Sequence, residues 1–544
     1  MSAEQTYETQ RIDHLGIVAG VCQEISLIEQ IDGQVKASER KVSCGKGTQA
    51  MILNALGFVG RALYMTPDYF DNKPVDLLIG PGLSAADFND DTLARCLDDL
   101  YEAGVTEVFY KVATHAMQVY GIKSKYVHLD SSSFHLHGAY DRQEADQEAI
   151  TITYGYSKDH RPDLKQVVVQ LITSYKSALP VWFEALSGNS NDKKTFTATI
   201  KAYCKQMSAS EQAYVVMDSA GFTAATMKTA QEQDVGWLMR VPETLAQAKQ
   251  LVKDTLETDM SEIEPGYKGK EVESEYAGVK QRWLVVFSEA AQVRELKTLE
   301  KVQAKELEAA QKEWRKVEGQ IFNCMVDAEQ AFTQFNKKWK YHQAKAQANP
   351  ITQYPRRGRP SAEDQKEVVG YHLQGGVEIN AAAIDDVKRT LGRFIIATNE
   401  LDADRLPAAG MLGNYTDQGI SVERGFRFLK DPLFFANSLF LKKPERIMAL
   451  LMIMGLALLV YSLAERKLRQ VLKAMNATVP NQLKKPTQTP TMRWVFQMFQ
   501  GLDILLIRQN GQTMLRKLVN LRPVQQQVIT LLGPQVQKCY LMGV

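Results

Sequence analysis

Hydrophobic and polar positions follow different rhythms along the 544-residue chain, and the changes of rhythm divide it into segments. In residues 1–120 the apolar positions recur at helical spacing, so this segment is expected to be mostly helical. From 121 to 244 strand-like runs come first, and helices and strands then alternate. That order predicts an α/β core built on a mixed sheet.

The α/β segment contains strand-like runs, marked by alternating or continuous apolar residues, and two amphipathic helical runs. The expected strands are 126–138, 149–157, 166–174, 179–188, 213–221 and 235–242. The expected helices are 193–207 and 224–233.

The rhythm breaks between 245 and 390, so this segment is expected to be an insertion in the core. It contains a strand-like run at 278–291 and then a long charged stretch from Glu289 to Gln347. Such a stretch is typical of a solvent-exposed helical hairpin or coiled coil. A proline-punctuated connector follows at 349–362. The α/β texture then resumes, and 391–465 is expected to complete the core.

Charge is distributed unevenly along the chain. The net charge is only +2, but residues 466–544 hold twelve Lys and Arg and one acid. Their local charge of +11 leaves −9 on the rest of the protein. A basic end of this kind is typical of a surface that binds nucleic-acid phosphates, although a merely solubilising surface has the same composition. The segment is therefore expected to bind DNA or to mediate dimerisation.

Cysteine usage and the N-terminus indicate the compartment. The six cysteines are scattered, with no CxxC pair and no histidine at ligand spacing. This pattern argues against a zinc site and against a disulfide framework. The N-terminus shows neither the basic start nor the apolar run of a secretory signal. A cytoplasmic location is expected.

Residues 447–464 carry no charge over eighteen positions, which is the lower limit for a membrane-spanning helix. Basic residues flank both ends, and the sequence offers no second span. A helix buried on all sides in a large protein has the same composition. We therefore expect a buried helix and no membrane partner.

Two aspartates end apolar, strand-like runs. Asp130 follows 126–129, and Asp218 follows 214–217 and precedes a short exit through Ser219 to Gly221. Isolated acids at strand ends commonly serve as turn or cap residues. Two carboxylates at strand ends are also what a pair of hard divalent cations needs, since Mg²⁺ prefers oxygen ligands.

A third carboxylate lies in the run 414–432, which is expected to be a helix. Glu423, Arg427 and Lys430 are spaced so that they share one face of it. An adjacent apolar stripe would dock the helix on a sheet. An ordinary surface ion pair is the structural alternative.

These residues resemble those of insertion-sequence transposases with a DDE triad and a Tyr-Arg-Glu-Lys signature. Tyr415, Glu423 and Lys430 match the signature, whereas Gln418 replaces its Arg and the Glu comes one residue late. A variant subgroup of these transposases has similar strings, and the resemblance spans about 120–470. The strings are GYSKDHRPDLKQ (155–166), SGNSNDK (187–193), VMDSAG (216–221) and ERGFRFLKDP (423–432).

The resemblance implies an RNase H-like core, interrupted by an insertion, with Asp130 on the first strand, Asp218 on the fourth and Glu423 on a helix. The implied activity is cut-and-paste transposition, with Mg²⁺ or Mn²⁺ held by the three carboxylates. The implied partner is double-stranded DNA, at the terminal inverted repeats and at the target. A homodimer on DNA, associated with the nucleoid, is expected, and 1–120 would recognise the repeats.

Several side chains are candidates for DNA contact. Arg427 and Lys430 would hold phosphates near the cleaved strand, and Tyr415 would touch the backbone or stack. Trp283 resembles in position a residue with which such transposases hold a flipped base, although a buried core role is the more usual one for a tryptophan. The remaining candidates are a short basic hook, Arg357 and Arg359, and a turn, Lys158 and Arg161.

Two other functions remain open at this stage. The chain is alternatively a different two-metal nuclease on the same core, or a transposase-derived DNA-binding protein without catalysis. The presence of all three carboxylates favours an active enzyme.

Overall fold

Nine strands form one central sheet in the computed structural model, which describes residues 5–58, 62–138, 140, 149–157, 159–175, 177–206, 213–355, 365–431, 441–510 and 512–542. At 192–193 and 418–421 only the backbone is described. In sheet order the strands are β4 (Pro180–Ser187), β3 (Lys165–Ser174), β2 (Tyr126–Leu136), β5 (Tyr214–Met217), β6 (Gly236–Arg240), β12 (Arg393–Thr398), β9 (Val279–Ser288), β8 (Tyr267–Tyr276) and β7 (Ser261–Glu264).

The first five strands of this sheet define the fold class. β2 pairs in parallel with β5, and β5 in parallel with β6, whereas β3 and β4 are antiparallel to their neighbours. Numbered by their order in the chain, these strands lie in the sequence 3-2-1-4-5. This is the RNase H-like arrangement, and the expected α/β core with a mixed sheet is confirmed.

One expected strand is absent. Residues 149–157 make a single antiparallel bridge, between Thr153 and Gln166, and form no strand. The physical reason is that β3 is already paired on both edges, with β2 and with β4. The β3–β4 ladder starts at Val167, which pairs with Ser187. Gln166, one residue earlier, is therefore the position of β3 whose edge is left for Thr153.

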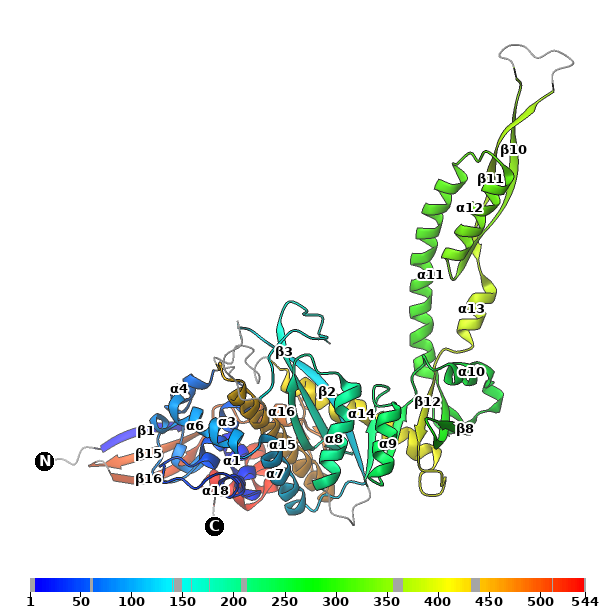
Figure 1. Cartoon of the computed structure of the whole chain (residues 1–544). Coiled ribbons are helices and arrows are strands. Elements are labelled where there is room, and N and C mark those ends of the chain that lie inside the picture. Colours follow the sequence, from blue (N-terminus) through cyan, green and yellow to red (C-terminus); the bar gives the residue numbers. More distant parts are fainter. Residues whose placement is uncertain are drawn as a thin grey trace.

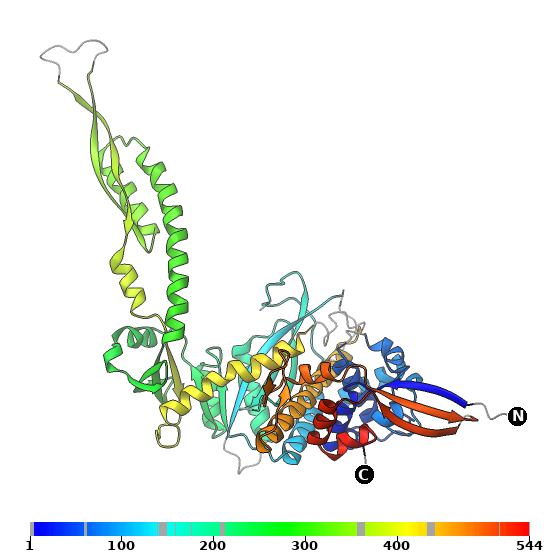
Figure 2. The same cartoon turned by 180° about the vertical axis from the view of Figure 1, so that it is seen from behind.

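Helices cover both faces of the sheet. One face packs against α8 (Asp192–Gln206), α9 (Ala224–Glu232) and α10 (Ala246–Asp254). The opposite face packs against α14 (Ala408–Leu429) and α15 (Pro444–Ala474). The long helix α14, yellow in Figure 2, runs from the base of a projecting arm into the body of the molecule.

Helix α15 contains the uncharged run and is a core helix. It is long and apolar enough to cross a membrane, but 83% of its apolar window is buried inside the protein. It packs against α3, α6, α7, α1 and β4. Within the described chain it is the sole helix that meets the criteria of length and composition for a span. The burial agrees with the expected buried helix.

The two end regions of the chain fold together around α15 rather than as separate units. β1 (Gln5–Arg11) pairs with β15 (Asp503–Gln509), which pairs with β16 (Gln512–Val519), so both ends share one sheet (Figure 1). The helices of the first region are α1 (Leu15–Glu24), α2 (Leu27–Asp32), α3 (Cys44–Leu56), α4 (Thr66–Phe70), α5 (Val75–Leu78), α6 (Asp90–Glu102) and α7 (Val105–Val119). The last region adds β13 (Val479–Pro480), β14 (Pro486–Thr487), α16 (Met492–Met498), α17 (Pro523–Leu532) and α18 (Pro534–Cys539).

Ion pairs also join these regions. Arg516 binds Asp76 through two hydrogen bonds of 2.7 and 3.0 Å, and Arg508 pairs with Glu8 at 3.2 Å. Some of the positive charge near the C-terminus is therefore paired, at the protein surface, with acids of the N-terminal region.

The segment 245–390 is only partly an insertion. Its strands β7 to β9 extend the central sheet, and the rest forms a long arm that projects from the body (Figure 1). The arm comprises α11 (Glu289–Glu318), α12 (Met325–Lys338), β10 (His342–Gln353), β11 (Glu367–Ile379) and α13 (Ala381–Lys388). Trp314, Phe335 and Leu373 form its small core.

The expectation of helix up to Gln347 is wrong for the last part of that run, because β10 already begins at His342 and pairs with β11. In β10, Ala344 is buried while Gln343 and Lys345 are exposed, which is the alternation of a strand. Ala, Gln and Lys are good helix formers, so composition concealed the period of two.

Candidate active site

The two aspartates come from neighbouring parallel strands. The ladder of β2 and β5 ends with His128 opposite Val216. Two residues further along each strand, the same register brings Asp130 opposite Asp218. Neighbouring strands lie about 4.8 Å apart, so these carboxylates start from adjacent backbone positions.

Both aspartates point to the face that α14 covers. Side chains two residues apart on a strand share a face. Tyr214 and Val216 of β5 belong to the apolar cluster that also holds Met411 and Leu412 of α14. Asp218 is two residues after Val216, so its side chain is expected on the same face of the sheet, toward α14.

Contacts at two levels place α14 along β2. The imidazole of His128 forms a hydrogen bond with the backbone of Asn414, and burial lowers its pKa to about 4. Farther along, the rings of Phe134 and Phe426 lie 6.5 Å apart. Asp130 lies between the two β2 contacts and Glu423 between the two α14 contacts. Asp130 and Glu423 therefore both lie in the stretch over which α14 runs along β2.

Tyr415 connects the helix to the strand ends. Burial is the main cause of its raised pKa, and the negative charges of Asp218 and Glu423 raise the pKa further. The side chain of Arg240 forms a hydrogen bond with Tyr415 and opposes that shift. Asp218, Glu423 and Arg240 therefore all lie close enough to Tyr415 to affect the ionisation of its hydroxyl.

Arg240 is a residue of the site that sequence reasoning missed. It is the last residue of β6, and the β5–β6 register, which ends with Met217 opposite Met239, brings it beside Asp218. Its side chain is 36% exposed and pairs with Glu243 at 2.6 Å. The signal was available, because Arg240 ends a buried apolar run as the two aspartates do.

The donor chemistry of the three carboxylates fits Mg²⁺ or Mn²⁺, because both metals take oxygen ligands. They are not drawn together in this conformation, since no group of three or more His, Cys, Asp or Glu in the described ranges is close enough to hold a metal ion. Glu423 is exposed, and one oxygen of each aspartate accepts a nearby backbone N–H, from Ser131 at 2.7 Å and from Ala220 at 2.9 Å.

The two side chains expected to bind phosphates, Arg427 and Lys430, differ in whether they already have a partner in the protein. Arg427 is exposed on α14. Lys430, the C-cap residue of α14, is bound: its Nζ lies 2.7 Å from Asp159 and 5.7 Å from the centre of the Phe134 ring. His135 lies on the other side of Asp159, at 3.5 Å. A phosphate would therefore compete with Asp159 for Lys430.

Among the remaining candidate phosphate contacts, Arg161 is the one that the structure describes. Arg161 is exposed and pairs with Asp163 at 2.7 Å. Lys158, Arg357 and Arg359 lie outside the described residues.

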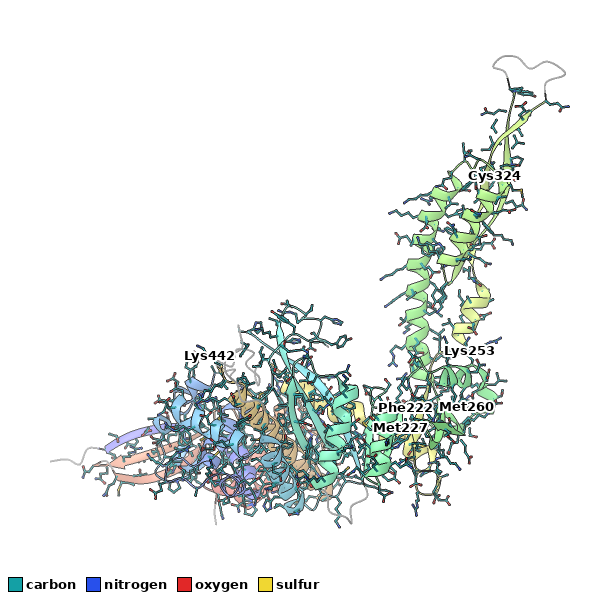
Figure 3. All side chains as sticks on the ribbon, in the orientation of Figure 1. Phe222, Met227, Lys253, Met260, Cys324 and Lys442 are labelled. Atoms are coloured by element: carbon teal, nitrogen blue, oxygen red, sulfur yellow. The ribbon has the colours of Figure 1, made fainter. Side chains whose placement is uncertain are left out.

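Trp283 belongs to the core. Its side chain is fully buried in β9, and its indole N–H donates to Oε1 of Gln281 at 2.7 Å. It packs in the cluster on the α9 side of the sheet, with Phe222 at a ring distance of 6.4 Å. Phe222 and Met227 of this cluster lie at the end of the body from which the arm rises (Figure 3). The indole thus faces away from the side of the sheet that carries Asp130 and Asp218.

An RNase H-like sheet with paired aspartates under a glutamate-bearing helix defines the class of the protein, and comparison with known families agrees. Residues 124–460 match the family described as Transposase DDE domain, and the chain belongs to this family. Residues 7–114 match a family described as a domain of unknown function (DUF4277). The specific Tyr-Arg-Glu-Lys subgroup stays a prediction.

No curated protein matches the sequence. One similar solved structure is a piggyBac transposase synaptic complex with hairpin DNA, determined by cryo-electron microscopy. It shares 10% sequence identity with a TM-score of 0.38, over 91% of this chain and 82% of that chain. This similarity is distant, and no property of the site rests on it.

Proposed function

We propose that the protein is an active transposase that moves an insertion sequence by a cut-and-paste reaction on double-stranded DNA. The observation that carries the proposal is the register of β2 and β5, whose last pair, His128 with Val216, lies two residues before Asp130 and Asp218. Membership of the Transposase DDE family supports it. The reaction would cut at the terminal inverted repeats and join the freed 3′-hydroxyl to target DNA, directly or after a hairpin intermediate.

The three carboxylates are proposed to hold Mg²⁺ or Mn²⁺. Two such ions would activate water and stabilise the attacking and leaving oxygens of a phosphodiester. Asp130 and Asp218 are fixed by strands, whereas Glu423 is an exposed side chain on a helix. Glu423 is therefore the carboxylate whose side chain would complete the set.

The surrounding cations are proposed to position the DNA. Arg427, and Lys430 once released from Asp159, would bind phosphates of the cleaved strand. Arg240 adds a guanidinium beside Asp218 and Tyr415. Recognition of the repeats by 1–120, a homodimer on DNA, and action at the nucleoid complete the proposal.

The test compares full-length wild type with Glu423→Gln on a DNA fragment that carries the terminal repeat flanking this element. Glu308→Gln is the matched control, because it makes the same change at an exposed position on α11 of the arm. Binding is measured by titration without divalent ion, and cleavage with Mg²⁺. We expect Glu423→Gln to bind like wild type and to lose cleavage by at least 100-fold, roughly the effect of removing one major catalytic group.

Each other outcome selects a different function. Equal cleavage by wild type and Glu423→Gln would show that another residue is the third carboxylate. Binding without cleavage by wild type, in both Mg²⁺ and Mn²⁺, would favour a transposase-derived DNA-binding protein. Cleavage that ignores the repeat would favour another kind of two-metal nuclease.

A further inference from the structure

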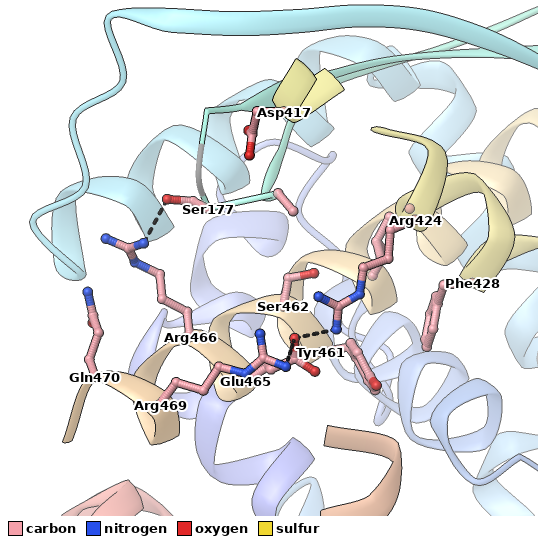
Figure 4. A pocket seen from close by; sticks show the side chains of 13 residues that line it. Ser177, Asp417, Arg424, Phe428, Tyr461, Ser462, Glu465, Arg466, Arg469 and Gln470 are labelled. Atoms are coloured by element: carbon pink, nitrogen blue, oxygen red, sulfur yellow. Dashed lines mark hydrogen bonds and ion pairs between the residues drawn. The ribbon is translucent and has the colours of Figure 1, made fainter. Parts of the chain in front are cut away.

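A cavity of about 330 Å³ lies between α14, α15 and the turn that joins β3 to β4 (Figure 4). It lies close to Glu423, because Arg424, the next residue of α14, is part of its wall, together with Asp417, Gly425 and Phe428 of the same helix. Three arginines line it, Arg424 on α14 and Arg466 and Arg469 on α15; Arg424 and Arg469 are directed to Glu465, and Arg466 is directed to Ser177 (Figure 4). The polar lining residues are Ser177, Asp417, Arg424, Tyr461, Ser462, Glu465, Arg466, Arg469 and Gln470.

Two of the arginines share one carboxylate. Glu465 accepts from Arg424 at 2.5 Å and pairs with Arg469 at 2.9 Å through the same oxygen, Oε1. Its other oxygen accepts the backbone N–H of Met492 at 2.8 Å. Glu465 is 7% exposed, so its single negative charge is already divided among these donors.

Arg466 has no such compensation. Its Nη1 donates to the hydroxyl of Ser177 at 2.8 Å, and its Nε is buried without a hydrogen-bond partner. No salt bridge of Arg466 occurs among the residues that the structure describes. Burial lowers its pKa, as expected for a guanidinium drawn from water without a counter-charge. A half-buried cation without a counter-charge is less stable than one in water, and an anion in the cavity would offset that cost.

The planar guanidinium groups suit a phosphate, whose several oxygens can be bound by more than one arginine at a time. The volume is about ten times the roughly 30 Å³ that one water occupies in the liquid, which leaves room for a phosphate with part of a sugar. The position next to Glu423 places such a phosphate beside the candidate catalytic helix. Successive helix residues project about 100° apart, so Arg424 lies on a face of α14 next to the face that carries Glu423.

We propose that this cavity, named here the arginine pocket (Arg424, Arg466 and Arg469), binds one backbone phosphate of DNA near the cleaved bond. The proposal rests on the proposed function only in taking DNA as the substrate. A free phosphate or nucleotide has the same recognition chemistry, and the test separates the two sources.

The test measures how DNA affinity depends on salt for full-length protein, without divalent ion. Arg466→Gln is compared with Lys473→Gln, an exposed lysine on the same helix that does not line the pocket. The plot of log K against log salt has a negative slope, and loss of one phosphate contact lowers the magnitude of that slope by about 0.9. We expect that decrease for Arg466→Gln, a partial restoration of affinity in Arg466→Lys, and the wild-type slope for Lys473→Gln.

A second variant guards against misfolding of Arg466→Gln. Gln470 is exposed at the rim of the pocket, and Gln470→Glu adds a negative charge there without disturbing buried residues. We expect it to weaken DNA binding by several-fold at low salt and to keep the wild-type unfolding midpoint.

Three results would overturn the proposal. In the first, Arg466→Gln and Gln470→Glu are folded and bind DNA with the wild-type affinity and slope. In the second, Lys473→Gln reduces the slope as much as Arg466→Gln. In the third, inorganic phosphate or pyrophosphate raises the unfolding midpoint of wild type but not of Arg466→Gln, while DNA affinity is the same in both. Binding and slope are read without cleavage, so a protein that binds DNA but never cuts it fails the proposed function alone.

Discussion

Replacing Trp283 separates a core role from a role in holding a flipped base. The indole is fully buried, and it packs against Phe222 on the face of the sheet opposite α14. Truncation to alanine removes a large buried ring and leaves a cavity. Substitutions of this kind cost about 3–5 kcal/mol.

The milder change Trp283→Phe keeps a ring in the cavity but removes the indole N–H. Gln281 then loses the donor that lies 2.7 Å from its Oε1, and its amide retains contacts with Met227 and Tyr276 at 3.3 and 3.4 Å. Leaving a buried acceptor unpaired costs about 1–3 kcal/mol. We therefore expect Trp283→Phe to lower the free energy of unfolding by roughly 1–3 kcal/mol, less than alanine does.

The assay is denaturant unfolding of full-length protein followed by circular dichroism, with DNA cleavage measured under native conditions. We expect Trp283→Phe to unfold earlier and to cleave and process DNA ends at the wild-type rate. The reasoning would be refuted if Trp283→Ala unfolded within 1 kcal/mol of wild type while the processing of DNA ends was lost. That result would require the indole to leave the core and act on DNA.

Three further predictions concern charged and titrating groups. Asp159→Asn releases Lys430 from an ion pair of 2.7 Å, and we expect a two- to five-fold gain in DNA affinity, measured by titration, since exposed pairs contribute up to about 1 kcal/mol. Arg516→Gln breaks the ion pair with Asp76, so the unfolding midpoint should fall slightly while DNA affinity stays unchanged. A loss of DNA affinity in this variant would show instead that the arginine binds DNA. Burial lowers the pKa of His14 to about 4 in the folded chain, from 6.5 for a free imidazole. Between these pH values His14 is protonated in the unfolded chain and neutral in the folded chain. Stability should therefore fall as pH decreases from 6.5 toward 4, and His14→Gln should remove about 2 kcal/mol of that loss at pH 5 in unfolding titrations.

The core strands were predictable because their side chains alternate between two covered faces. In β2, Val127 and Leu129 pack on the α9 side and Phe134 on the other, and that period of two is legible in one sequence. The two acids were legible for the same reason, since each follows an apolar run, Asp130 within β2 and Asp218 directly after β5. Whether two such acids face each other depends on register between strands almost 90 residues apart, and only the β2–β5 ladder supplies it.

Other features depend on pairings that composition does not encode. The β10–β11 hairpin is built from Ala, Gln and Lys, whose helical propensity outweighs a weak alternation until a partner strand is present. The basic end of the chain suggested a free DNA-binding surface, but Arg508 and Arg516 meet acids that lie more than 400 positions earlier. The arginine pocket, too, is lined by residues of α14, α15 and the turn between β3 and β4. Because these segments are far apart in the sequence, no local sequence pattern predicts the pocket.

The sheet that unites β1 with β15 and β16 constrains how the protein is made. When α7 leaves the ribosome, the partners of the first helices in α15, α17 and α18 have yet to be synthesised. At usual rates of translation the wait before β15 emerges is roughly 20 to 80 s. Throughout this interval Leu53 and Phe109, which end as fully buried residues, lack part of their cover. A nascent chain that stops early would thus expose an apolar surface that the complete fold buries.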